Sequence, residues 1–310
     1  MLARIAAVAL NAYREAVRAR ILYGLLGVAL ATTAYSLVVA TLSLHQEVRV
    51  VADLGAASIS LYSVFVAIVL GATSLYNELE LKTIFPILTR KLRRHEYIIG
   101  KYLGILGTML VFVLIQGAVT LTILAFQARP DKTAPLVVDP LLAAGLALLL
   151  WRARLVRSFV VLPWAIVAFV AMVILAAPAG EERQLVVVSA ALTLAEVAII
   201  AAIATFFSSF SSPFLTAIFT LMVFLIGRSS DTLANLPPKL FGDLVHDIGA
   251  VLAKIVPNLN VYVPARPLLL GELPNVPVGA YVARAWANAI GYAVVLLSLS
   301  ALVFRKRDFQ

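Results

Sequence analysis

The chain has 310 residues, of which 62% are hydrophobic and only 13% are charged, and its mean hydropathy is +1.00. These values lie far outside the range of soluble domains and predict a polytopic membrane protein. The absence of cysteine excludes disulfides, iron–sulfur clusters and thiolate nucleophiles, and a net charge of +9 in so apolar a chain indicates membrane topology rather than nucleic-acid binding.

The first twenty residues predict an amphipathic helix that lies in the membrane interface. Apolar residues recur at helical spacing between Leu2 and Val17, and arginines share the opposite side. The apolar run that follows, residues 21–44, is too long for the core of a cleaved signal peptide, so we interpret it as a retained span. The alternative is that residues 1–20 extend this first span with a charged end.

Apolar runs of about 17–25 residues, long enough to cross a bilayer, recur along the rest of the chain. We predict an all-α membrane bundle of about eight spans, at residues 21–44, 55–76, 98–126, 136–150, 156–177, 185–207, 214–227 and 284–304. The run 136–150 is short and contains the helix-start pair Asp139-Pro140. Residues 136–177 are therefore either an inserted pair of spans or one re-entrant element.

Arginine and lysine concentrate on one side of the membrane when eight spans are counted with the amino terminus inside. This positive-inside asymmetry predicts cytoplasmic amino and carboxyl termini for a multi-pass protein of the cell inner membrane. The long connection 228–283 is then extracytoplasmic. Its apolar spacing from Leu240 to Ile255 predicts an amphipathic surface helix, and the proline-rich segment after it predicts an extended lid that receives an external partner or caps an exit. The alternative is a packed surface connection.

Residues 78–97 form a charged segment between the second and third spans. Glu78 and Glu80 stand where a short helix begins, and the basic residues 90–94 lie toward its far end, which is the charge distribution that a helix dipole favours. A short amphipathic helix on a cytoplasmic loop suits docking to a soluble partner. The alternative is that the basic cluster anchors the loop to anionic lipid.

The run from Glu80 to Gly104 resembles the loop of ABC transporter permeases of the type-2 class, which have the type V exporter fold. The features in common are a glutamate, a Thr-Ile pair, a leucine-rich turn, a basic pair, an acidic-aromatic pair, and Gly-Lys followed by Leu-Gly. In this chain they are Glu80, Thr83, Ile84, Leu88, Arg93, Arg94, Glu96, Tyr97, Gly100, Lys101, Leu103 and Gly104. FFSSFSSPF at residues 206–214 and the ending FRKRDF are similar to two further regions of the class, and the nearest subgroup is the multicopper-enzyme maturation permeases.

The resemblance implies that residues 1–310 form one permease domain with six core spans, to which the pair at 136–177 is added. Residues 1–20 would be the connector helix of the family, and residues 78–97 the coupling helix that sits in an ATPase subunit. The coupling residues would be Glu78, Glu80, Thr83, Arg90, Arg93, Arg94, Glu96 and Lys101. Lys91 departs from the pattern, because many relatives have proline there.

The chain contains no GxxxxGK[ST] sequence, so we expect it to hold no cofactor and to depend on a partner ATPase that binds ATP and Mg²⁺. The resemblance implies a homodimer of permeases with two ATPase chains, surrounded by membrane lipid, that performs export or mechanical transmission. The histidines His45, His95 and His246 fall on both sides of the membrane without an HExxH motif, so we expect no catalytic or metal site. The alternative function is an ATP-independent secondary transporter or channel.

Three polar residues inside predicted spans, Gln116, Glu196 and Asn288, are candidate functional groups because polar side chains are costly in hydrocarbon. Glu196 can face a substrate path, pair with a basic group on another helix, or remain protonated. Gln116 and Asn288 are expected to join helices, and the glycines at positions 100, 104 and 107 to permit close helix packing.

Overall fold

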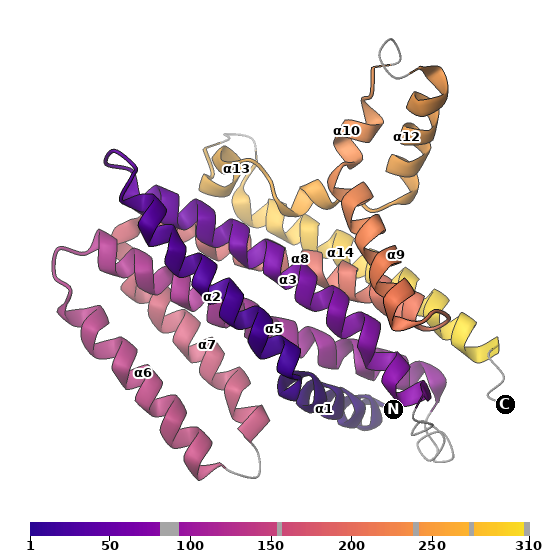
Figure 1. The fold of residues 1–310 in the computed structure, drawn as a ribbon, viewed down its shortest axis with the longest axis horizontal. Helices are drawn as coiled ribbons and strands as arrows, with labels where there is room; N and C mark the ends of the chain where they lie inside the picture. Colours follow the sequence, from indigo (N-terminus) through magenta and orange to yellow (C-terminus); the bar gives the residue numbers. More distant parts are fainter. Residues whose placement is uncertain (81–92, 154–156, 238–241, 273–275, 307–310) are drawn as a thin grey trace.

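The computed structural model describes residues 1–80, 93–153, 157–237, 242–272 and 276–306, and all regular secondary structure in these residues is helical. Seven helices of the described chain are long and apolar enough to cross a membrane. They are α2 (Arg20–Ala40), α3 (Glu47–Glu80), α5 (Arg94–Ala128), α6 (Thr133–Arg152), α7 (Arg157–Leu175), α8 (Glu181–Ser208) and α14 (Val278–Lys306). The prediction of a polytopic helical bundle is thereby confirmed (Figure 1).

The eighth predicted span, at 214–227, forms the shorter helix α9 (Pro213–Arg228). Its 16 residues cover about 24 Å at a rise of 1.5 Å per residue, less than the roughly 30 Å of a hydrocarbon core. Pro213 occupies the first position of this helix, where its missing N–H costs nothing. The serine-rich sequence before it ends α8, because the hydroxyls of Ser209 and Ser211 bond the carbonyls of Phe206 and Phe207.

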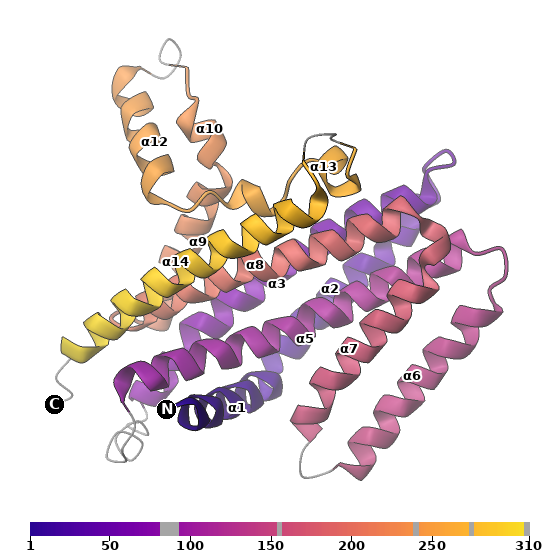
Figure 2. The ribbon, with the colours of Figure 1, turned by 180° about the vertical axis from the view of Figure 1, so that it is seen from behind.

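The centre of the bundle is formed by α5 and α8, with α3 and α14 packed against them (Figure 2). Small residues let these helices approach closely. A Cβ atom on Gly71 of α3 would lie 2.4 Å from the Cβ of Ala204 on α8. One on Gly55 of α3 would lie 2.3 Å from the Cγ2 of Thr120 on α5. The buried core lies along the contacts that α3 makes with α5 and α8.

The first residues of the chain form a helix of their own, α1 (Leu2–Arg18), which lies across one end of the bundle (Figure 1). The extended backbone of Ala19 separates it from α2, so α1 does not continue the first span. Gly100 and Gly104 of α5 face α1. Their Cβ atoms would lie 2.6 Å from the Cβ of Val8 and 2.5 Å from that of Ala12. We call this end of the molecule the α1 end.

The region predicted to be an insertion forms two separate helices, α6 and α7, followed by the short 3₁₀ helix η1 (Ala177–Ala179). α7 packs on α5, where the ring of Phe169 covers Gly117. α6 packs mainly on α7, and Trp164 of α7 donates from its indole to the carbonyl of Leu142 at 3.1 Å. The pair stands at the side of the bundle with α6 outermost (Figures 1 and 2).

The long connection before α14 contains α10 (Ser230–Ala234), α12 (Asp243–Ile255), η2 (Leu259–Tyr262) and α13 (Arg266–Leu270). α10 and α12 pair with each other and stand out from the bundle (Figure 1), and α12 is the predicted amphipathic helix. The structure differs from the predicted extended lid. Leu259 and Tyr262 are buried in the 3₁₀ turn η2, which the side chain of Asn258 begins by accepting from the N–H of Asn260 at 2.9 Å.

Candidate functional site

Those predicted coupling residues that the structure describes lie at the α1 end, where α3 ends and α5 begins. Glu78 and Glu80 belong to the last turn of α3, and Arg94 is the first residue of α5. Thr83 and Arg90 lie outside the described residues. The boundaries predicted for the coupling helix, 78–97, therefore overlap the ends of two long helices.

Glu96 caps α5 and reaches α1. Its carboxylate accepts the backbone N–H of Arg93 at 3.0 Å, which satisfies a free donor in the first turn of the helix. The same oxygen lies 3.6 Å from Nη1 of Arg4, and only 1% of the Glu96 side chain is exposed. A charge so placed joins the start of α1 to the start of α5.

Lys101 joins three helices. Its ammonium group donates to Oε2 of Glu15 on α1 at 3.0 Å and to the carbonyl of Ser74 on α3 at 3.3 Å. The Lys101 side chain is 2% exposed, whereas that of Glu15 is 47% exposed. Lys101 is thus an internal link between α1, α3 and α5, placed one turn of helix beyond Glu96.

Arg93 and Arg94 lie closer to the surface. Arg93 is exposed and Arg94 is partly buried, in contrast to Glu96 and Lys101. These four residues of the predicted coupling set therefore divide into two that a partner protein can reach and two that hold the helices together. The latter pair can influence a partner only through the helices that they join.

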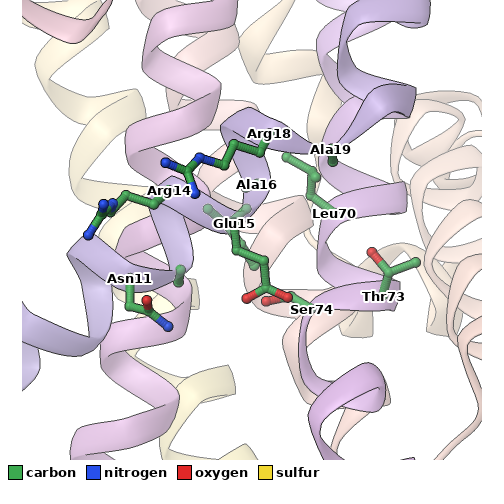
Figure 3. A pocket seen from close by; sticks show the side chains of 11 residues that line it. Asn11, Arg14, Glu15, Ala16, Arg18, Ala19, Leu70, Thr73 and Ser74 are labelled. Carbon is green, nitrogen blue, oxygen red and sulfur yellow. The ribbon is translucent and has the colours of Figure 1, made fainter. Parts of the chain in front are cut away.

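A cavity of about 680 Å³ opens beside this junction, between α1 and the last turns of α3 (Figure 3). Arg14, Glu15 and Arg18 line it from α1, and Thr73 and Ser74 line it from α3. Figure 3 shows the carboxylate of Glu15 directed toward Ser74, and both arginines directed away from it. The guanidinium group of Arg14 lies 5.1 Å from the ring centre of Phe159 on α7, so α1 also contacts the inserted pair.

A second cluster of charge lies inside the bundle, around Glu196 of α8. Its Oε1 lies 3.0 Å from Nη2 of Arg228, the last residue of α9, and its Oε2 accepts from the hydroxyl of Ser60 on α3 at 3.2 Å. Arg228 also donates to Ser60 at 3.0 Å. Of the three roles considered for Glu196, the structure shows pairing with a basic group on another helix.

Sequence reasoning missed Arg228, which was assigned to the external connection. The available signal was the length of the apolar run, since a helix of 16 residues is shorter than the hydrocarbon core is thick and so places its last residue within that core. Its terminal arginine then lies beside the middle of α8, where a carboxylate satisfies it.

A cavity of about 470 Å³ lies over this ion pair, between α3, α8, α9 and the connection before α14. Ser60, Arg228, Tyr262 and Arg266 are among its lining residues. Arg266 forms ion pairs with Asp53 of α3 and Glu182 of α8. The hydrogen bond that Arg266 donates to Glu182, together with the charges of both carboxylates, raises the pKa of Arg266 above its ordinary value. The outer wall of this cavity is therefore a network of paired charges.

The other two polar residues join neighbouring elements. Gln116 of α5 donates to the hydroxyl of Ser58 on α3 at 2.5 Å, and Ser58 lies 3.3 Å from the hydroxyl of Thr33 on α2. Asn288 of α14 donates to the phenol of Tyr262 in η2 at 3.4 Å. Gln116 thus connects three helices, and Asn288 connects α14 to the segment that closes the bundle.

Within the described residues, no three histidine, aspartate or glutamate side chains are grouped so that they could hold a metal ion. Neither the comparison with protein-family models nor the comparison with curated proteins found a match.

Proposed function

We propose that the chain is the membrane-spanning permease subunit of a transporter that is powered by a separate cytoplasmic ATPase. The observation that carries the proposal is the junction at the α1 end, where Lys101 and Glu96 tie α1, α3 and α5 together around the predicted docking segment. A force applied between α3 and α5 acts on all three helices because buried ion pairs and close glycine contacts join them.

The lengths of α3 and α5 support this role. At 34 and 35 residues they are about 51 and 52 Å long, well beyond the roughly 30 Å of a hydrocarbon core. Unless both are strongly tilted, one end of each helix stands outside the membrane. The ends of α3 and α5 at the α1 end would then be available to a soluble protein.

The proposed topology has eight crossings, with α9 as a short one, and both termini in the cytoplasm. The carboxyl end of α14 lies at the same end of the bundle as α1 (Figure 1), which agrees with an even number of crossings. Arginine and lysine are concentrated at that end by sequence. The family resemblance adds a homodimeric assembly with two ATPase chains, and export or force transmission as the activity.

The test is co-purification from native membranes in mild detergent, followed by identification of associated ATPase subunits and measurement of ATP hydrolysis. We expect Glu80→Arg and Arg93→Glu to lower the amount of bound ATPase at least several-fold. Matched controls reverse charge at the other ends of the same helices, Glu47→Arg for α3 and Lys132→Glu just beyond α5. The proposal fails if no ATPase is retained, or if the two sets of variants behave alike.

The second candidate function is an ATP-independent secondary transporter, which the pair Glu196–Arg228 under the 470 Å³ cavity favours. A buried carboxylate whose charged partner lines a cavity between helices is the kind of group that ion-coupled transporters use. This candidate predicts that vesicles containing the purified chain alone show proton or ion flux without ATP and without an ATPase subunit. Loss of that flux in Glu196→Gln would favour it over the ATP-driven permease.

A further inference from the structure

A cleft remains between α6 and the helices that it faces, because α6 contacts the bundle mainly through α7. One part, of about 540 Å³, lies at the α1 end, and a second part of about 350 Å³ continues toward the opposite end. Ile115 of α5 and Leu146 of α6 border both parts. The two parts therefore adjoin and follow α6 along much of its length.

The walls of this cleft are mostly apolar, with Thr122 and Asp139 among the residues that line the second part. Leu22 and Leu26 of α2, Val111 and Ile115 of α5, and Leu146 of α6 line the part at the α1 end. A space of this kind between membrane helices must be filled, since an empty void forfeits the dispersion contacts of every atom around it. The chemistry that fits the walls is a flexible hydrocarbon chain.

The mouth of the cleft at the α1 end is basic. Arg18 and Arg157 line it together with the hydroxyl of Ser158, and none of the residues that line this part is acidic. Neither arginine forms an ion pair with a carboxylate in the described part of the chain. Arg157 donates from Nε to the carbonyl of Leu150 at 3.0 Å, a contact that uses one of its five N–H donors.

We propose that this cleft binds one anionic phospholipid, with its phosphate at Arg18 and Arg157 and an acyl chain along α6. Guanidinium groups bind phosphate through paired N–H donors, and basic pockets between membrane helices on the cytoplasmic side bind anionic lipid headgroups. The lipid would join the outlying pair α6–α7 to α1 and α2. Lipid binding in this cleft requires no ATPase partner, so its test is independent of the test of the proposed function.

Native mass spectrometry of the purified chain with added phosphatidylglycerol or phosphatidylcholine of the same acyl chains tests the headgroup contact. Wild type should retain phosphatidylglycerol in a one-to-one complex and release phosphatidylcholine. The double variant Arg18→Gln/Arg157→Gln should bind phosphatidylglycerol roughly thirty-fold more weakly, at about 1 kcal/mol per arginine. Arg20→Gln, an exposed arginine two residues from Arg18 that does not line the cleft, should bind like wild type.

A second pair of variants tests the hydrocarbon chain. Leu146→Trp fills the cleft and should abolish the one-to-one complex while leaving every arginine in place. Leu148→Trp changes an exposed position of the same helix that does not line the cleft and should have no effect. The proposal is overturned if the two lipids are retained equally, if the double arginine variant matches Arg20→Gln, or if the two tryptophan variants match. The last result would mean that arginine attracts lipid to the surface only.

Discussion

α5 and α6 follow one another in the chain and are both apolar enough to span a membrane, yet one is central and the other peripheral. In the most apolar stretch of each helix, 67% of the residues are buried in α5 and 6% are buried in α6. The difference in burial comes from small and polar residues, whose effect on helix packing is not measured by hydropathy. α5 places glycine, threonine and glutamine on faces that meet α1, α3 and α7, whereas α6 presents mostly leucine and alanine. Small and polar residues, not apolar content, indicate a position inside a membrane bundle.

The largest expected effect comes from removing a charge in the centre. Glu196→Leu in α8, the other central helix, leaves Arg228 without its carboxylate inside the bundle, which costs about 3–5 kcal/mol of folding stability. Thermal or denaturant unfolding in detergent measures it. The double variant Glu196→Leu/Arg228→Met should recover most of the loss, because no unpaired charge remains.

The matched substitution on α6 is Asp139→Leu, at a partly buried carboxylate near the start of that helix. It should leave stability unchanged or raise it, because Asp139 borders the cleft between α5 and α6, where an apolar side chain avoids the cost of burying a carboxylate. Equal losses from Glu196→Leu and Asp139→Leu would show that the contrast between central and peripheral helices is mistaken.

Replacing a glycine by alanine should change folding stability in opposite directions in α5 and α6. Gly104→Ala in α5 places a Cβ 2.5 Å from the Cβ of Ala12 and 2.6 Å from the carbonyl oxygen of Ala9, so α1 must move away, at about 1–3 kcal/mol. Gly145→Ala in α6 meets nothing within 4 Å and should stabilise by about 0.5–1 kcal/mol through helix propensity. Unfolding midpoints of the two variants should shift in opposite directions. A shift of the same sign in both would contradict the close contact between α1 and α5.

A smaller effect is expected from the hydrogen bond that joins α5 to α3. Gln116→Leu removes the donor to Ser58, and hydrogen bonds between membrane helices are worth about 0.6 kcal/mol on average. A double-mutant cycle with Ser58→Ala isolates the bond, because the loss in the double variant should be less than the sum of the single losses. Strict additivity would mean that the two side chains do not interact.

The sequence predicts the helical class and the separate α1 well, because the period of apolar residues and the length of each run determine them. It also predicts the close packing at Gly100 and Gly104, since small residues at helical spacing have few other uses in a membrane. It does not predict the partners of those glycines, or that Arg228 pairs with Glu196. Both depend on which helices become neighbours, which is decided by packing over the whole bundle rather than by any local pattern.

The burial of Glu96 and Lys101 also depends on which helices become neighbours. Both carry charge, and both are 2% exposed or less because α1 packs over the start of α5. Only contacts between residues about 90 positions apart place them inside. The family resemblance therefore assigned to a docking surface two residues that hold the helices together.

The smallest effect is expected at the start of α6, where Asp131 accepts hydrogen bonds from the backbone N–H and hydroxyl of Thr133 at 2.9 and 2.8 Å. These bonds lower the pKa of Asp131 below its ordinary value. A carboxylate with a lowered pKa in the folded state stabilises the fold above its unfolded pKa, and this contribution disappears as the pH falls through the folded pKa. Asp131→Ala should therefore unfold slightly earlier than wild type at pH 6, and the difference should vanish at a pH below the lowered value. Because Asp131 is exposed and begins a helix that few contacts hold, a large difference at pH 6 would mean that α6 is fixed to the bundle more firmly than its burial indicates.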